Sequence, residues 1–183
     1  TTLFRSQYGD ENYQPQNDSV FQGDSDAPAR IFNVHLPWGN GNVIWDCGDD
    51  TGYDRLLKAA QENEYMGKWN HWVFSKNLNN DSMKIYLNGQ LWTERSNLNK
   101  SIGTVAYFSI GANSTATLGF YDGIIDDFRI YDYELSPEEV AEIYYDGLIP
   151  VCFGCSEYLS GDINYDCKVD MKDLADISSC WLN

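Results

Sequence analysis

The alternation of apolar and polar residues begins at Arg30. Residues 1–29 are polar and rich in Gly, Asp and Asn, a composition that predicts loops. After that, short runs alternate with a period of two, the pattern of half-buried strands. Turn residues every 8–12 positions then predict an all-β, antiparallel β-sandwich. The expected strands are 30–36, 43–45, 69–76, 83–87, 90–93, 107–111, 118–121 and 124–131.

Two glycine-containing turns join neighbouring expected strands into hairpins. Asn88-Gly89 is the dipeptide that a two-residue type I′ turn favours, because both of its positions need a positive φ. Gly39-Asn40-Gly41 separates another pair of apolar runs. Both turns predict antiparallel pairing of the strands beside them.

One short helix is expected at the end of the sandwich. Ser136 can cap its N-terminus, and Glu139 stands at the position that completes a capping box. Val140 and Ile143 begin an apolar stripe at helical spacing, and Gly147 ends the pattern. We place the end of this first domain at residue 148.

The charge of the chain limits which classes of molecule it can bind. The chain of 183 residues carries 28 acidic and 12 basic side chains, a formal net charge of −16. This excess of negative charge argues against nucleic acid, whose phosphates must be met by Lys and Arg. It suits hard cations such as Ca²⁺. No apolar run approaches the ~18 residues of a membrane span, so no membrane span is expected.

Four of the five cysteines crowd into the tail, where little sequence is available for a core. Such crowding predicts disulfides and an oxidising, secreted or cell-surface location. A zinc site is the alternative, but the C-x-x-C pair lacks a second close pair. The sequence does not determine which of the four tail cysteines pair with each other. The tail cysteines are Cys152, Cys155, Cys167 and Cys180, and Cys47 is expected to be a buried thiol.

The stretch from Gly123 to Tyr144, with G-I-I-D-D-F-R-I-Y followed by L-S-P-E-E-V-A-E-I-Y, resembles the closing signature of laminin-G-like, concanavalin A-like jelly-roll domains. W-N-H-W-V-F and K-I-Y-L-N-G-Q resemble the central strands of that family. The resemblance implies such a domain over residues 1–148. The family's opening F-D-G-x-x-D-Y motif does not precede Arg30. We therefore expect missing opening strands and an exposed sheet edge, through which the chain can associate with itself.

The tail resembles a dockerin-type, EF-hand-like calcium loop, with spacing D-x-N-x-D-x-x-x-D-x-x-D. Oxygens at positions 1, 3, 5, 7, 9 and 12 match the six to eight oxygen ligands of calcium. The expected ligands are Asp162, Asn164, Asp166, the Lys168 carbonyl, Asp170 and Asp173. The resemblance implies a Cys-containing linker over 149–160 and a calcium loop–helix appendage over 161–183, similar to tails of secreted planctomycete-like bacterial proteins. Dockerins typically carry two such loops, whereas only one is present here. The single loop argues against a cohesin-like partner, which is kept only as an alternative.

Aromatic and polar residues between the first expected strands form a candidate ligand site. Trp38 follows a proline at a turn and is the aromatic residue expected to be exposed, whereas Trp45 and Trp92 are expected in the core. Such a ring can stack on a sugar. The polar candidates beside it are His35, Asp46, Tyr53 and Arg55.

Catalytic constellations are not evident in the sequence. Asp126 and Asp127 are adjacent on an expected strand, so alternation sends them to opposite faces and they cannot act as one pair. Asp126 is a further candidate metal ligand. His35 and His71 lie in expected strands, and no G-x-S-x-G occurs.

These features predict an extracellular, non-catalytic, calcium-binding recognition or adhesion module for glycans or a cell-surface protein. One alternative is a structural subunit of a surface or extracellular assembly. Another is an accessory module of a larger polysaccharide-degrading enzyme.

Overall fold

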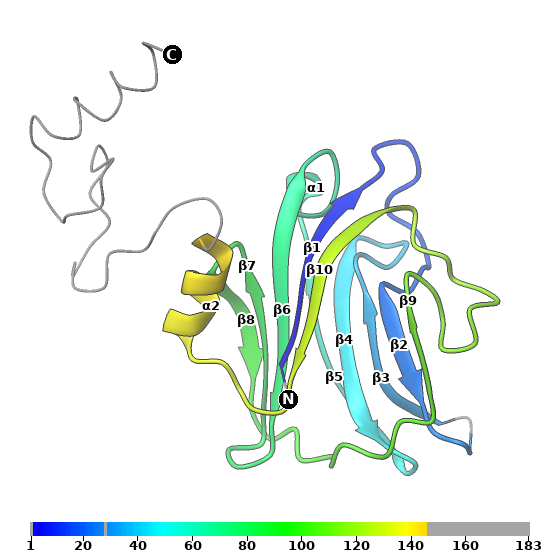
Figure 1. Ribbon diagram of the computed structural model, residues 1–183, viewed down its shortest axis with the longest axis vertical. Helices are drawn as coiled ribbons and strands as arrows, with labels where there is room; N and C mark the ends of the chain where they lie inside the picture. Colours follow the sequence, from blue (N-terminus) through cyan, green and yellow to red (C-terminus); the bar gives the residue numbers. More distant parts are fainter. Residues whose placement is uncertain (1, 28, 146–183) are drawn as a thin grey trace, which may run out of the picture. The chain divides into compact units, whose positions relative to one another are not determined.

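The computed structural model describes residues 2–27 and 29–145 (Figure 1). The chain divides into two units, Thr1–Ala141 and Glu142–Asn183, and the β-sandwich lies in the first. The expected linker and calcium appendage, with their four cysteines, lie outside the described residues. Within the described part, no helix is long and apolar enough to cross a membrane.

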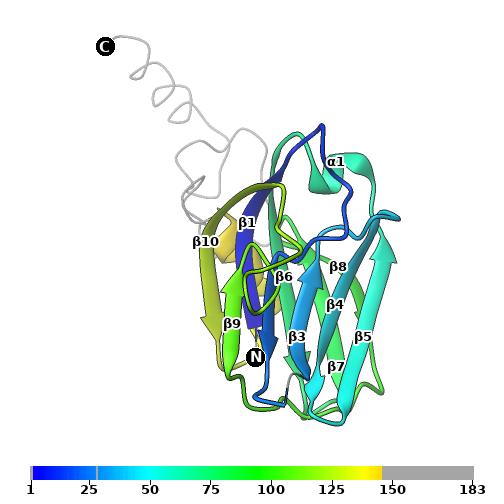
Figure 2. The same cartoon turned by 90° about the vertical axis from the view of Figure 1, so that its right-hand side faces the viewer.

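In the described part of the chain, ten strands form two antiparallel five-stranded sheets, which face each other as the layers of a sandwich (Figures 1 and 2). Sheet A has the order β10-β1-β6-β7-β8, and sheet B has the order β5-β4-β3-β2-β9. The elements are β1 (Thr2–Gly9), β2 (Phe21–Asp24), β3 (Arg30–His35), β4 (Asn42–Asp49), β5 (Gly52–Ala59), α1 (Glu62–Tyr65), β6 (Trp69–Asn77), β7 (Ser82–Leu87), β8 (Gln90–Arg95), β9 (Tyr107–Ile110), β10 (Gly123–Tyr131) and α2 (Pro137–Tyr145). The expected antiparallel sandwich is confirmed, as is the helix that follows it.

Local signals in the sequence account for the turn and the cap that were predicted. Asn88 and Gly89 have φ values of 50° and 81° in the β7–β8 turn, the left-handed geometry of a type I′ hairpin. At the start of α2, the Glu139 carboxylate accepts a hydrogen bond from the Ser136 amide at 2.7 Å. The Glu139 amide in turn donates to the Ser136 hydroxyl at 3.1 Å, so the capping box is complete.

The N-terminal segment was expected to be irregular, and this expectation is wrong. β1 lies inside sheet A between β10 and β6, and β2 lies inside sheet B between β3 and β9. Polar residues at buried positions hide the alternation. Gln7 on β1 is fully buried and accepts a hydrogen bond from the Tyr121 hydroxyl at 2.5 Å.

Two further strand predictions differ from the structure. Residues 118–121 were expected to form a strand but lie in a loop, where Leu118 and Phe120 are exposed. β5 was not predicted, because its charged residues Asp54, Arg55 and Lys58 interrupt the apolar pattern. As the last strand of sheet B, β5 has one open edge and needs few apolar side chains.

The core between the sheets is built on aromatic side chains. The Phe21 ring lies 5.5–6.2 Å, centroid to centroid, from four other rings. Trp45 is buried, as predicted, and its indole N–H donates to the Ser75 carbonyl of the opposite sheet at 3.1 Å. Trp92 is partly buried against the same core. Apart from Phe21, the rings of this cluster are those of Phe32, Trp45, Phe74 and Phe128.

Candidate functional site

A row of polar side chains crosses sheet B, with each residue paired to the next one on the neighbouring strand. Alternation sends Phe21 and Trp45 into the core, so their strand neighbours point to the outer face of the sheet, the face turned to the viewer in Figure 2. Successive register partners on that face, one from each of the five strands, are Ser109, Gln22, Asn33, Asp46 and Arg55. The topology thus gathers residues that are far apart in the sequence.

A second set of side chains continues this face toward the β4–β5 turn. Tyr107 pairs with Asp24, and Asp24 pairs with Arg30. Tyr53 stands two residues before Arg55 on β5 and therefore shares its face. We call the two sets together the polar face of sheet B.

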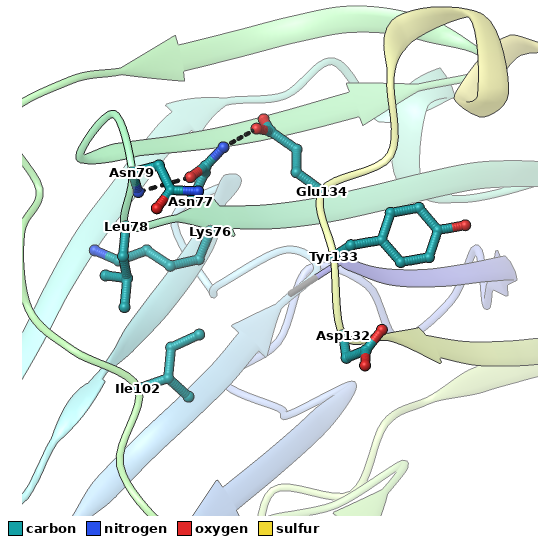
Figure 3. Close-up of a pocket in the computed structure, with 8 residues that line it drawn as sticks. All are labelled: Lys76, Asn77, Leu78, Asn79, Ile102, Asp132, Tyr133 and Glu134. Atoms are coloured by element: carbon teal, nitrogen blue, oxygen red, sulfur yellow. Dashed lines mark hydrogen bonds between the residues drawn. The ribbon is translucent and has the colours of Figure 1, made fainter.

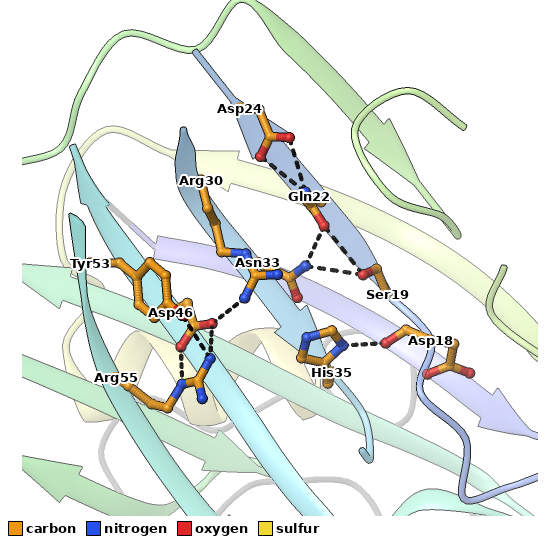
Figure 4. Close-up of polar contacts among 10 residues, drawn as sticks. All are labelled: Asp18, Ser19, Gln22, Asp24, Arg30, Asn33, His35, Asp46, Tyr53 and Arg55. Atoms are coloured by element: carbon orange, nitrogen blue, oxygen red, sulfur yellow. Dashed lines mark hydrogen bonds and ion pairs between the residues drawn. The ribbon is translucent and has the colours of Figure 1, made fainter. Parts of the chain in front are cut away.

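The Asp46 carboxylate is the centre of this face. Its side chain is fully buried, and two guanidinium groups neutralise it (Figure 4). Arg55 donates from Nε to Oδ1 at 2.6 Å and from Nη2 to Oδ2 at 2.7 Å. Arg30 donates from Nη1 to Oδ2 at 2.7 Å. The hydrogen bonds to Asp46 also raise the pKa of Arg55, so this guanidinium stays charged.

Tyr53 covers the two arginines and is itself open to solvent. The guanidinium carbons of Arg30 and Arg55 lie 5.4 and 5.2 Å from the centroid of its ring, which is within cation–π range. Arg55 Nη2 also donates to the Tyr53 hydroxyl at 3.2 Å. Tyr53 is 41% exposed, so an aromatic surface of fixed orientation faces the solvent.

Amide groups extend the network across β2 and β3. Asn33 donates from Nδ2 to Gln22 Oε1 at 2.6 Å and to Ser19 Oγ at 3.0 Å. Gln22 donates from Nε2 to both carboxylate oxygens of Asp24 at 3.0 Å. Asn33 is fully buried, and its Oδ1 accepts no hydrogen bond from the described residues.

His35 and Trp38 lie at the end of the face next to the β3–β4 turn. Burial lowers the pKa of His35 to about 4, so the imidazole is neutral at pH 7. Its Nδ1 contacts the Asp18 carbonyl. The Trp38 ring packs on the imidazole with centroids 4.3 Å apart at 64°, which leaves it half-buried rather than fully exposed.

The structure therefore brings His35, Asp46, Tyr53 and Arg55 onto one face, with Trp38 at its end. Buried His35 and Asp46 can support a ligand site only from beneath, whereas Tyr53 and Arg55 reach solvent. Sequence reasoning missed further members of the face. Two of them sit in β2, which was not predicted, and the others lie in predicted strands whose order in the sheet the sequence does not give. The missed members are Gln22, Asp24, Arg30, Asn33, Tyr107 and Ser109.

A surface pocket of about 350 Å³ lies near the C-terminal end of β6 (Figure 3). Its Glu134 carboxylate accepts from Asn77 Nδ2 and pairs with Lys84 Nζ at 2.8 Å. Glu134 is thus engaged by Asn77 and Lys84, whereas the arginines of sheet B keep further N–H donors. We therefore place the candidate site on the polar face. The pocket is lined by Lys76, Asn77, Leu78, Asn79, Ile102, Asp132, Tyr133 and Glu134.

Asp126 is exposed on β10, and its carboxylate accepts from the Asp127 amide at 2.8 Å. The strict alternation expected here is interrupted: the register shifts between Phe4 and Ser6 of β1, and Asp127 has a φ of 51°. Among the described residues, no group of three or more His, Cys, Asp or Glu side chains is arranged to hold a metal. The predicted calcium ligands from Asp162 to Asp173 lie outside the described residues.

Solved structures with the same architecture include three kinds of domain. The Ruminococcus gnavus IT-sialidase CBM40, bound to α2,3-sialyllactose, is 17% identical with a TM-score of 0.60, over 78% of this chain and 81% of that one. The botulinum neurotoxin serotype D binding domain is 18% identical with a TM-score of 0.60, over 79% and 36%. A heptameric SAP-like pentraxin from Limulus polyphemus is 13% identical with a TM-score of 0.58, over 78% and 68%. This chain thus spans just over a third of the length of the neurotoxin domain, and at these identities the likeness shows the fold alone.

No curated protein sequence matches the chain. The sequence model of the concanavalin A-like lectin/glucanases superfamily, a laminin-G type, matches residues 10–141. That match covers most of the chain and agrees with the two-sheet sandwich, so the expected family is confirmed. The chain belongs to the concanavalin A-like lectin/glucanases superfamily.

Proposed function

We propose that this chain is an extracellular, non-catalytic module that binds glycans through the polar face of sheet B. The sialidase CBM40 carries a bound sialyllactose on a similar sandwich, and the neurotoxin structures are receptor-binding domains. These similarities support a recognition role.

The observation that carries the proposal is the exposed Tyr53 ring, held over the two arginines that Asp46 fixes. A sugar presents an apolar C–H face, which can stack on such a ring, and hydroxyl groups, which exchange hydrogen bonds with guanidinium and amide groups. Because the ion pairs already order the arginines, binding costs less conformational entropy than it would with free side chains.

The chemistry of the carboxylates supports a non-catalytic role. Glycosidases generally need two carboxyl groups that face one cleft, one of them as a proton donor. Asp46 is buried and accepts three hydrogen bonds from arginines. Asp24 accepts from Gln22 and from the Ser114 hydroxyl. Both carboxylates therefore serve to orient their neighbours.

Calcium binding by the C-terminal loop is a separate part of the proposal. Oxygen-bearing side chains occur at five of the loop positions that calcium-binding loops use, from Asp162 to Asp173. The acidic composition and the crowded tail cysteines favour a secreted or cell-surface setting. We propose that calcium orders the tail, while the sandwich carries the ligand site.

A glycan array probed with the intact chain, followed by calorimetry on the strongest ligand, tests the function. Tyr53→Ala should weaken binding at least about tenfold, the loss of one good stacking contact. Tyr133→Ala is the matched control, since Tyr133 is 50% exposed but follows β10 of sheet A. Equal affinity of both variants and the parent would refute the assigned face. Ordered oligomers without any glycan binding would favour the structural-subunit alternative.

A further inference from the structure

We propose that the polar face of sheet B selects glycans that carry a carboxylate group, with Arg30 and Arg55 as the residues that recognise it. This inference rests on the proposed glycan-binding function and names the chemical class of its ligand. It follows from the balance of charge and of hydrogen-bond donors around Asp46.

Both arginines pair with the same carboxylate. Two guanidinium groups contact Asp46, so this cluster alone carries one positive charge in excess, and Asp24, the second carboxylate of the face, forms no ion pair with either arginine. Arginine keeps its charge at any physiological pH. An anionic group bound beside Tyr53 would balance this excess charge.

The two arginines keep N–H donors that their hydrogen bonds to Asp46 do not use. Arg30 uses only Nη1 in its hydrogen bond to Asp46, and Arg55 uses Nε and Nη2. Arg30 Nε and Nη2 and Arg55 Nη1 have no acceptor among the described residues. The two side chains are 27% and 39% exposed, so these N–H groups can reach a ligand. The guanidinium fork matches the two oxygens of a carboxylate, which a sugar hydroxyl cannot do.

Asp24 is the nearest other carboxylate that could pair with Arg30, and it is hydrogen-bonded to other residues. Asp24 is the register partner of Arg30, but no ion pair joins them. In Figure 4 the Asp24 side chain faces Gln22, while the Arg30 side chain extends toward Asp46. The hydrogen bonds from Gln22 and Ser114 hold Asp24 in this orientation. The free edge of the arginine pair is therefore left to an external acceptor.

An array of acidic and neutral glycans tests the inference, followed by titrations with two matched pairs: 3′-sialyllactose with lactose, and trigalacturonic acid with its methyl ester. We expect carboxylated glycans to be preferred, by roughly ten- to hundredfold within a pair that binds, the range for a hydrogen bond to a charged group. Arg30→Gln should abolish most of this preference. That variant leaves Asp46 both hydrogen bonds from Arg55, which protects the fold.

Lys58→Gln is the matched control, because it removes a positive charge from the same sheet but at a position over Trp92. Equal binding of acidic and neutral glycans would overturn the selectivity and leave the proposed function standing. Two other results would also overturn the role of Arg30 in selectivity and leave the proposed function standing. One is that the preference for acidic glycans survives in Arg30→Gln, and the other is that Lys58→Gln loses it equally. Absence of binding to every glycan on the array would instead refute the proposed function itself.

Discussion

The buried carboxylate of Asp46 makes the folded state sensitive to the loss of Arg55. The substitution Arg55→Met keeps much of the side-chain length but removes two of the three hydrogen bonds that Asp46 accepts from arginines. Arg30 alone would then neutralise a carboxylate that is fully buried. The matched substitution Arg30→Met removes only one of the three bonds.

The expected cost follows from this count. A hydrogen bond to a charged group contributes about 1.5–3 kcal/mol, and an unsatisfied buried partner is what makes its loss costly. Arg55 is 39% exposed, so water can replace part of its contribution, and we use the lower end of that range. The free energy of unfolding should therefore fall by about 3 kcal/mol in Arg55→Met and by about 1–1.5 kcal/mol in Arg30→Met.

Urea unfolding followed by tryptophan fluorescence measures both values, because buried Trp45 reports loss of the core. A smaller loss of stability in Arg55→Met than in Arg30→Met would refute this prediction.

Three further predictions concern other parts of the chain. Burial raises the pKa of Asp18 from 3.8 to about 7, so the folded state holds this proton more tightly than the unfolded chain, and stability falls as the pH rises from about 4 to 7. Asp18→Asn should therefore melt above the parent at pH 7.5 and lose that advantage at pH 4; a pH-independent difference would contradict this cause. Cys47 is buried and its pKa is raised to about 12, so a thiol reagent should label it only in denaturant. If the tail cysteines form two disulfides, Cys47 should then be the single free thiol. Labelling of the native chain at Cys47 would contradict this prediction. Asp162→Ala/Asp166→Ala should abolish one calcium site in calorimetry, and an unchanged calcium stoichiometry would refute the loop assignment.

Features that depend on neighbouring residues could be predicted from the sequence. The Asn88-Gly89 turn needs only two positive φ angles, and the Ser136 and Glu139 box spans a single helical turn. The pairing of Asp46 with Arg55 also has a short-range cause, because β4 and β5 form one hairpin. For this reason, four of the five predicted ligand-site residues lie together on one face, and Trp38 borders it.

The rest of the site depends on the order of strands in sheet B, which no local pattern gives. Gln22 joins the face because β2 lies between β3 and β9, and Ser109 joins it through β9. Gln22 also follows a polar stretch that predicts loops, so its strand was missed. Trp38 was expected to be exposed, but the sequence does not show that its ring packs on His35.

Mapping a bound glycan by NMR on the ¹⁵N-labelled chain is the most direct test of the central claim. The array would supply the ligand, and the Nε–H signals of Arg30 and Arg55 would be followed with the backbone amides. The account predicts that the largest shifts fall on these two signals and on the amides of β3, β4 and β5 around Tyr53. Shifts confined to the pocket of Asn77 and Glu134, or to sheet A, would contradict it.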